Sequence, residues 1–245
     1  MRVITPVSAI LFCMALLQPG TTRAISVGQV DTFEDATLQG WRMGVASVTD
    51  SHMSNIADGG PAGTGDNFLR VVADGTNVAG GRLTFFNSLQ WTGDYTAAGI
   101  TAIAMDLNNL SASESLNLRL ALNGGFVDPS GTSIIGGVFA TTTSISLDIG
   151  SGWTKVVFSL LPDDLTPVSG SRGPNPAGND VLTTLANVQE LRLLNSATPD
   201  WNGLPVVGAL GIDNIQAVPL PPALALLGSG LLVLLARGRK QHLQT

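Results

Sequence analysis

The strongest constraint on this chain is the alternation of apolar and polar residues within short segments. Between residues 116 and 122, leucine occupies every even-numbered position, and Asn117, Arg119 and Ala121 occupy the positions between. Successive side chains of an extended strand point to opposite faces, so the four leucines would share one buried face of a sheet. Further short, mostly alternating segments lie at residues 68–72, 82–86, 100–107, 144–147, 153–160, 190–194 and 211–216.

Clusters of Gly, Asn, Asp, Ser and Pro separate these segments, which is the composition of turns. Many short strands joined by turns predict an all-β fold, and we expect an antiparallel β-sandwich of the jelly-roll kind. Only one helix is predicted, at residues 179–188, where Asp180 would cap the first turn. Residues 162–178 are rich in Pro, Gly and Ser and are predicted to form a loop.

The first 24 residues have the composition of a secretory signal peptide. Arg2 precedes an apolar run at residues 7–17, and small residues follow at Thr22 and Ala24. This order predicts cleavage after Ala24 and export of the remainder.

The body between the two ends, residues 25–217, is predicted to be one domain. The single cysteine, Cys13, lies in the predicted signal peptide, so disulfides cannot stabilise the body. The body carries 7 basic and 18 acidic residues, a net charge of −11. Such a charge argues against nucleic acid and anionic lipid as partners and is compatible with cations or neutral sugars.

The last 28 residues, 218–245, form a distinct tail. Prolines precede an uncharged run that is predicted to cross a membrane as a helix at about residues 221–236, and a basic cluster follows at 237–240. The basic end would lie in the cytoplasm and the body outside. On these residues alone, a permanent membrane anchor and a removable signal both remain open.

The tail resembles the PEP-CTERM class of sorting signals, in its VPLP-type variant. The resemblance implies a Gram-negative bacterium, processing by an exosortase-type membrane protease, and release to the cell surface or an exopolysaccharide matrix. The residues that carry it are Val218, Pro219, Leu220, Pro221, Pro222, Arg237, Arg239 and Lys240, around a span that contains Gly228, Ser229 and Gly230.

The body carries a second resemblance. Residues 31–35, 40–41 and 211–215 are similar to the first and last strands of jelly-roll carbohydrate-binding modules, and residues 65–69 and 80–85 resemble laminin-B-like sandwiches. The first of these implies a structural calcium ion held by Glu34 and Asp213. The alternative, that both are ordinary carboxylates of an acidic surface, stays open, because the chain has no dense Asp-x-Asp-x-Asp loop.

Three aromatic residues are candidates for sugar binding. Trp91, Tyr95 and Trp201 stand beside Asp and Asn in Gly-containing turns, from which their rings could project. Packing in the core is the competing interpretation, because large aromatic side chains dominate sandwich cores. Trp41 and Trp153 each follow a glycine at an expected strand start and are predicted to be core residues.

Catalytic constellations are scarce. The body has one histidine, His52, no cysteine and no Gly-x-Ser-x-Gly motif, so it lacks the residues for nucleophilic catalysis or a His/Cys zinc site. We therefore expect an exported, non-catalytic protein of the cell surface or extracellular matrix, with a structural or adhesive role that includes carbohydrate binding. A polysaccharide-active hydrolase or lyase with two carboxylates, and a permanently anchored periplasmic protein, are the alternatives.

Overall fold

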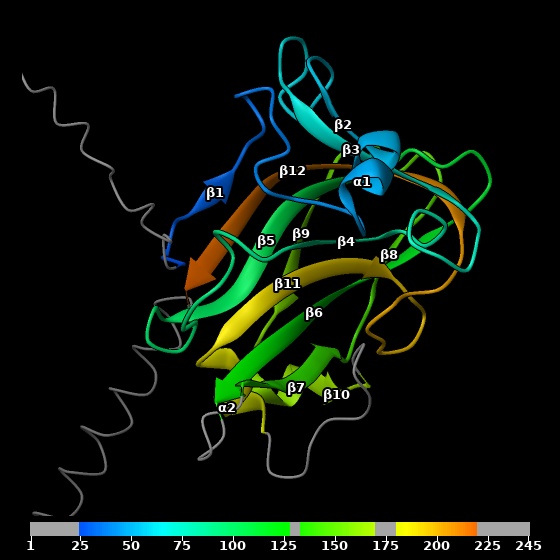
Figure 1. The fold of residues 1–245 in the computed structure, drawn as a ribbon. Coiled ribbons are helices and arrows are strands. Elements are labelled where there is room, and N and C mark those ends of the chain that lie inside the picture. The colour runs from blue at the N-terminus through cyan, green and yellow to red at the C-terminus, as the bar shows by residue number, and fades with distance from the viewer. Residues whose placement is uncertain (1–24, 128–132, 170–179, 220–245) are drawn as a thin grey trace, which may run out of the picture.

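The computed structural model describes residues 25–127, 133–169 and 180–219. In these residues, twelve strands form two antiparallel sheets that pack face to face (Figure 1). The predicted antiparallel β-sandwich is therefore confirmed. The strands of the first sheet, sheet A, are β1 (Val30–Asp31), β2 (Met53–Ile56), β3 (Phe68–Asp74), β5 (Ile100–Asn109), β9 (Thr154–Ser159) and β12 (Val207–Pro219).

The second sheet, sheet B, lies opposite. Its strands are β4 (Thr84–Asn87), β6 (Leu116–Val127), β7 (Ser133–Thr141), β8 (Ile145–Leu147), β10 (Leu165–Pro167) and β11 (Val188–Asn195). The strand order is β2-β3-β12-β5-β9 in sheet A, with β1 on β12, and β10-β7-β6-β11-β4 in sheet B, with β8 on β6. Consecutive strands often lie in different sheets, so the two sheets are tied together along the whole described chain.

The alternation of residues places the core between the sheets. Leu116, Leu118, Leu120 and Leu122 of β6 are all buried in the main apolar cluster, as predicted. The alternate residues of the same strand, Arg119 among them, point to the outer face of sheet B. The same alternation gives β5 and β12 one core face and one outer face, so each sheet has an outer surface built from alternate residues.

The two short helices agree only in part with the prediction from the sequence. Helix α2 (Val181–Leu185) begins as predicted, because the Asp180 carboxylate accepts a hydrogen bond of 2.7 Å from the Thr183 amide. The expectation of a single helix is wrong, because α1 (Ala46–His52) also forms. The hydroxyl of Thr49 fixes α1 to the preceding chain through both backbone groups of Met43. The prediction of a loop at residues 162–178 is wrong at its start, where a 3-10 turn, η1 (Pro162–Asp164), leads into strand β10; residues 170–178 lie outside the described residues.

Both predicted targeting segments lie almost entirely outside the described residues. Strand β12 nevertheless reaches Pro219, with Val218 paired to Ala102 and Pro219 to Ile100 of β5. The predicted border between body and tail at residues 217 and 218 thus falls inside a strand. No helix within residues 25–127, 133–169 and 180–219 is long and apolar enough to cross a membrane, and the predicted span 221–236 lies beyond them.

Candidate functional site

Two of the predicted sugar-binding aromatics belong to the core. Trp91 and Tyr95 are 0% exposed, so the expectation of projecting rings is wrong for both. The indole N–H of Trp91 donates to the Asp31 carboxylate at 2.6 Å, and Trp41 donates to the same oxygen at 2.8 Å. The Tyr95 hydroxyl donates to the Trp91 carbonyl at 2.9 Å. Burial raises the pKa of Asp31, while the indole hydrogen bonds stabilise its charged form.

The third candidate, Trp201, lies on a different surface but is also covered. It is 1% exposed and packs on the outer face of sheet B, against a small apolar cluster separate from the main core. The guanidinium of Arg192 stacks over its ring at 3.7 Å. Trp201 is therefore no open platform, and it supports the surface that Arg192 occupies. The cluster beside it comprises Ala121, Val138, Ala140 and Leu194.

Arg119 holds the loop of Trp201 in place. Its side chain is 4% exposed and donates hydrogen bonds to the carbonyls of Thr141, Thr142, Ser196 and Ala197, at 2.5, 2.7, 3.0 and 2.7 Å. Desolvation lowers the pKa of this guanidinium. One side chain thus joins the end of β7 to the loop that follows β11, and so fixes where Trp201 rests on the sheet.

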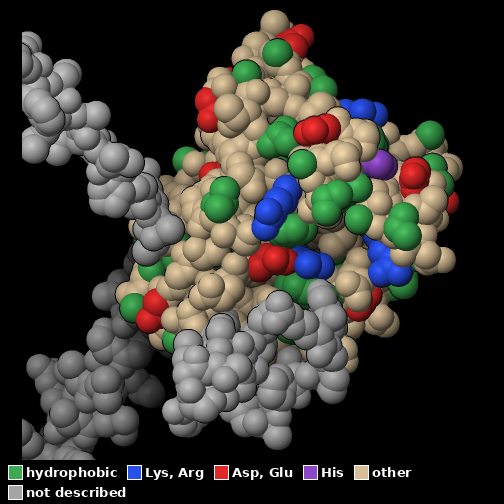
Figure 2. Space-filling view, in the orientation of Figure 1, with side chains coloured by type: hydrophobic (Ala, Val, Ile, Leu, Met, Phe, Trp, Pro, Cys, Tyr) green, Lys and Arg blue, Asp and Glu red, His purple; other side chains and the backbone are tan. Residues whose placement is uncertain are grey.

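A pocket of about 210 Å³ lies on this outer face of sheet B, where β4 and β11 are paired. In the register of that pair, Arg192 stands directly opposite Phe86. Figure 2 shows Lys and Arg side chains (blue) around a hollow on this side of the molecule. We call this pocket the sheet B groove. Its lining residues are Gly44, Asn77, Val78, Ala79, Arg82, Thr84, Phe86, Arg192 and Asn202.

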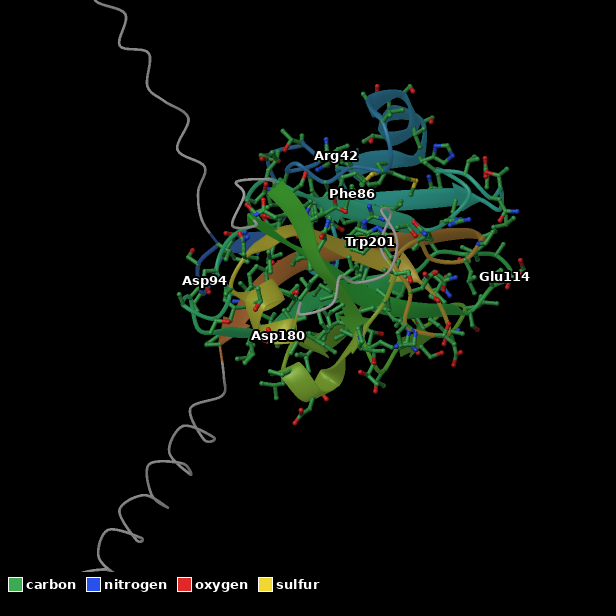
Figure 3. The ribbon with its side chains drawn as sticks, turned by 60° about the horizontal axis from the view of Figure 1, so that its bottom comes forward. Arg42, Phe86, Asp94, Glu114, Asp180 and Trp201 are labelled. Atoms are coloured by element: carbon green, nitrogen blue, oxygen red, sulfur yellow. The ribbon has the colours of Figure 1, made fainter. Side chains whose placement is uncertain are left out.

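Aromatic rings and guanidinium groups alternate along the groove. The Arg42 guanidinium lies 4.8 Å from the centre of the Phe86 ring, and that of Arg192 lies 5.1 Å from it. Figure 3 shows Arg42, Phe86 and Trp201 in succession across this face. Arg192 is held by the Glu190 carboxylate at 2.5 Å and by the Trp201 carbonyl at 3.2 Å. Burial lowers the pKa of Arg192, and the charge of Glu190 opposes that effect.

Arg82 also lines the groove. Its side chain, unlike that of Arg192, forms no hydrogen bond within the described residues. Its backbone bridges to both Ala79 and Pro205, which fixes it where two loops meet β4. Its Nε atom is buried without a hydrogen-bond partner. Its terminal nitrogens also have no hydrogen-bond partner within the described residues, so the guanidinium keeps donors for an acceptor bound in the pocket.

The outer face of sheet A has the opposite character. Asp213 of β12 is 1% exposed; one of its oxygens accepts from the Asn214 side chain at 3.0 Å, and the other, Oδ1, is buried without a partner. Desolvation, together with the negative charges of Asp66, Asp106 and Glu34, raises its pKa to about 7. Asp213 therefore lies within electrostatic range of three other carboxylates, and their negative charges repel its own.

The residues around Asp213 could supply some of the ligands that a bound cation needs. Glu34 and Asp213 do come into electrostatic range of each other, and the orphaned oxygen of Asp213 is of the type that binds calcium. Glu34 also accepts a hydrogen bond of 3.0 Å from the Asn67 amide. Within the described residues, however, no group of three or more His, Cys, Asp and Glu side chains is arranged to hold a metal ion. Further ligands would have to come from carbonyl and amide oxygens.

The two remaining tryptophans, Trp41 and Trp153, differ in their burial. Trp41 is a core residue, as predicted. Trp153 is only half-buried, so its assignment to the core is wrong. It packs edge-on against Phe68 on the outer face of sheet A, with 5.2 Å between ring centres, and donates to the Gly59 carbonyl at 2.9 Å. His52 ends α1 and hydrogen-bonds within that helix, at Ser51 and the Val48 carbonyl.

Comparisons with known proteins bear on the fold. No protein-family model matches the chain, and no curated protein sequence matches it. Among solved structures, it is similar to an exo-beta-agarase at 15% identity and a TM-score of 0.51, over 80% of this chain and 26% of that one. What the two share is the fold.

Two carbohydrate-binding modules are also similar. One is a family 11 module from Clostridium thermocellum in complex with a beta-1,3-1,4-mixed-linked tetrasaccharide, at 19% identity and a TM-score of 0.49, over 79% of this chain and 97% of the module. The other is a CBM22-1 xylan-binding domain from Paenibacillus barcinonensis, at 12% identity and a TM-score of 0.41, over 80% of this chain and 99% of the domain.

The groove residues were missed at the level of sequence, although a signal for them exists. Residues 82, 84 and 86 alternate with buried Leu83 and Phe85, and residues 190 and 192 alternate with buried Leu191 and Leu193. The polar and aromatic members of both segments could have been assigned to one outer face. That the two segments pair with each other needs the register, which the sequence does not contain.

Proposed function

We propose that this chain is an exported, non-catalytic protein that binds carbohydrate at the cell surface or within extracellular polysaccharide. The sheet B groove is its binding site. The observation that carries the proposal is the half-buried Phe86 ring between two guanidinium groups in a pocket with polar walls. Sugar rings pack their apolar faces on aromatic side chains, while hydroxyls bond to polar groups around them.

The polar groups of the groove suit binding better than hydrolysis. A glycosidase needs two carboxylic groups on either side of the scissile bond, whereas no Asp or Glu lines the pocket. Glu190, the nearest carboxylate in the register, is engaged by Arg192. Arginine, asparagine and threonine side chains remain, and they can donate to hydroxyl or acidic oxygens.

The proposal is tested by retention of the purified full chain on a panel of polysaccharides, measured by pull-down and affinity electrophoresis. Phe86→Ala should weaken retention about tenfold, an estimate based on aromatic contacts in binding sites. Val157→Ala, on the exposed outer face of sheet A, is the matched control and should bind normally. If no polysaccharide retains the wild-type chain, the proposal is wrong. Release of sugar products in the same samples would favour the hydrolase or lyase alternative.

We also propose that the tail directs sorting by an exosortase-type protease, on the strength of the residues at 218–222 and 237–240. Because β12 continues to Pro219, cleavage would occur directly beyond the last strand. Intact mass and location in the native host test this. A chain without Arg237, Arg239 and Lys240, recovered from the surface or matrix, is expected; a full-length tail retained in the inner membrane would mean a permanent anchor.

We further propose a structural calcium ion at Asp213 and Glu34, supported by the orphaned Asp213 oxygen. Each would supply a carboxylate, and the ion would cancel the repulsion among the acidic side chains. Thermal melts with millimolar calcium and with chelator are the test, because a metal that binds only the folded state raises Tm. Asp213→Asn should abolish the shift, and Asp50→Asn, an exposed residue of α1, should keep it. No shift in the wild-type chain would rule the site out.

A further inference from the structure

The charge of the sheet B groove is opposite to that of the whole body. Residues 25–217 carry a net charge of −11. Arg42, Arg82 and Arg192 nevertheless meet around the groove, and Glu190 is the acidic side chain paired with them. The field inside a pocket depends on the nearest charges, since more distant ones are screened within about 10 Å by salt. The groove is therefore locally cationic on an acidic protein.

Among the three arginines around the groove, Arg82 has the most unused donors, because Arg42 bonds to Ser88 and Arg192 bonds to Glu190 and Trp201. Within the described residues it forms no ion pair and no side-chain hydrogen bond, and its buried Nε atom has no acceptor. Arg119, which is buried on the same face, has its donors bound to four carbonyls. The difference separates a residue that stabilises the fold from one that is available to a ligand.

Arg192 adds a second positive charge that is fixed in position. Glu190 and the Trp201 carbonyl take up its Nε and one terminal nitrogen, and the centres of the Phe86 and Trp201 rings lie 5.1 and 3.7 Å from its Cζ atom. Because Arg42, Arg82 and Arg192 outnumber Glu190, an acidic group entering between Arg82 and Arg192 meets a net positive charge. A guanidinium presents a planar fork of donors that matches the two oxygens of a carboxylate or sulfate.

We propose that the sheet B groove selects acidic glycans, whose sugars carry carboxylate or sulfate groups, with Arg82 as the residue that binds the acidic group and Phe86 as the surface for the sugar ring. This inference rests on the proposed function, because it names the ligand class of the same site. It adds that a neutral sugar chain of the same shape binds more weakly, since it leaves the Arg82 fork without an acceptor.

The test compares ligands that differ only in charge. Polygalacturonate and its fully methyl-esterified form share a backbone, and dextran sulfate and dextran share another. Binding of the purified full chain is measured by titration calorimetry at two salt concentrations. We expect the acidic member of at least one pair to bind about tenfold more tightly than its neutral partner, as for a charge-assisted hydrogen-bonded pair.

Matched variants show whether Arg82 is responsible. Arg82→Ala should remove the preference for the acidic ligand, and Arg82→Lys should restore it only in part because lysine lacks the fork. Arg70→Ala, an exposed arginine on the outer face of sheet A, makes the same change of charge and should leave binding unchanged. Thermal melts of each variant check that the fold is retained.

The outcomes separate the two proposals. Preference for polygalacturonate assigns the carboxylate as the acidic group, and preference for dextran sulfate assigns the sulfate; both support the inference if Arg82→Ala abolishes them. Equal binding of acidic and neutral partners overturns the inference and leaves carbohydrate binding intact. An acidic preference that Arg70→Ala weakens as much as Arg82→Ala also overturns it, because the effect is then one of overall charge.

Discussion

The two outer faces of the sandwich are built by the same alternation of residues. Each nevertheless contains a buried polar atom without a hydrogen-bond partner, and the two atoms belong to side chains of opposite charge. On sheet A, the buried Asp213 oxygen has no donor and lies among other carboxylates. On sheet B, the buried Arg82 nitrogen has no acceptor and lies near a second guanidinium. Both groups carry a desolvation cost that a ligand of opposite charge would offset.

The difference teaches that the net charge of a chain says little about any one of its surfaces. Acidic residues are in excess in the body, whereas four of the five arginines that the structure describes, Arg42, Arg82, Arg119 and Arg192, lie on the side of sheet B. A cation would stabilise the face with Asp213, and an anion would bind the face with Arg82. The fold keeps these two groups on opposite sides of the core, so that each can be changed without the other.

The largest expected effect is that of changing Arg119, which holds the Trp201 loop on the outer face of sheet B but does not line the groove. Arg119→Ala leaves four carbonyls without donors and should lower the free energy of unfolding by about 3–5 kcal/mol, measured by urea denaturation. It should also abolish glycan binding by releasing the Trp201 loop. Arg70→Ala on the opposite face should stay within about 0.5 kcal/mol of wild type. A comparable loss for Arg70→Ala would contradict the distinction between the two faces.

The next effect concerns Asp213 and is driven by pH. Its folded pKa of about 7 lies above the ordinary value of 3.8, so the folded state keeps a proton that the unfolded state loses. In chelator, the free energy of unfolding should therefore fall as pH rises from about 4 to 7, by about 2 kcal/mol after allowance for screening. Asp213→Asn should remove this decrease. Millimolar calcium should reduce it in the wild-type chain; an unchanged pH profile in Asp213→Asn would mean that other groups cause it.

The smallest effect concerns Arg42 at the rim of the groove. Its side chain is exposed, stacks on Phe86 and bonds to the Ser88 hydroxyl at 2.8 Å. Arg42→Ala should leave Tm unchanged and slow association with an acidic glycan about two- to threefold, because rim charges act chiefly on encounter. Stopped-flow kinetics at low and high salt measure this. An effect confined to the dissociation rate would mean that Arg42 belongs to the bound contact.

The fold was predictable where a local signal sufficed. The leucines of β6 alternate over a full strand, and Asp180 has the side chain that a helix start requires, so both elements were found. Helix α1 has Val45 at its N-cap position, where no side chain caps the first turn, so the sequence carried no such signal. Strand β7 was also missed, since Gly136 and Gly137 interrupt its apolar pattern.

The binding site was less predictable than the fold, because it depends on the direction in which each side chain points and on the register in which the strands pair. A tryptophan beside glycine and aspartate can project or pack, and Trp91 packs because the buried Asp31 accepts its indole N–H. Phe86 and Arg192 are over 100 positions apart in the sequence and become neighbours only through the pairing of β4 with β11. By contrast, the proximity of Glu34 and Asp213 was anticipated from a family resemblance, and the metal itself stays a prediction.

Hydrogen–deuterium exchange of the full chain, with and without an excess of the best-binding glycan, tests the central claim most directly. Protection should appear in peptides that cover residues 82–87 and 190–202, which include Arg82, Phe86 and Arg192 of the sheet B groove, and not in those that cover strands β3 and β9 of sheet A. Protection confined to β3 and β9, with the groove unchanged, would contradict the assignment of the binding site.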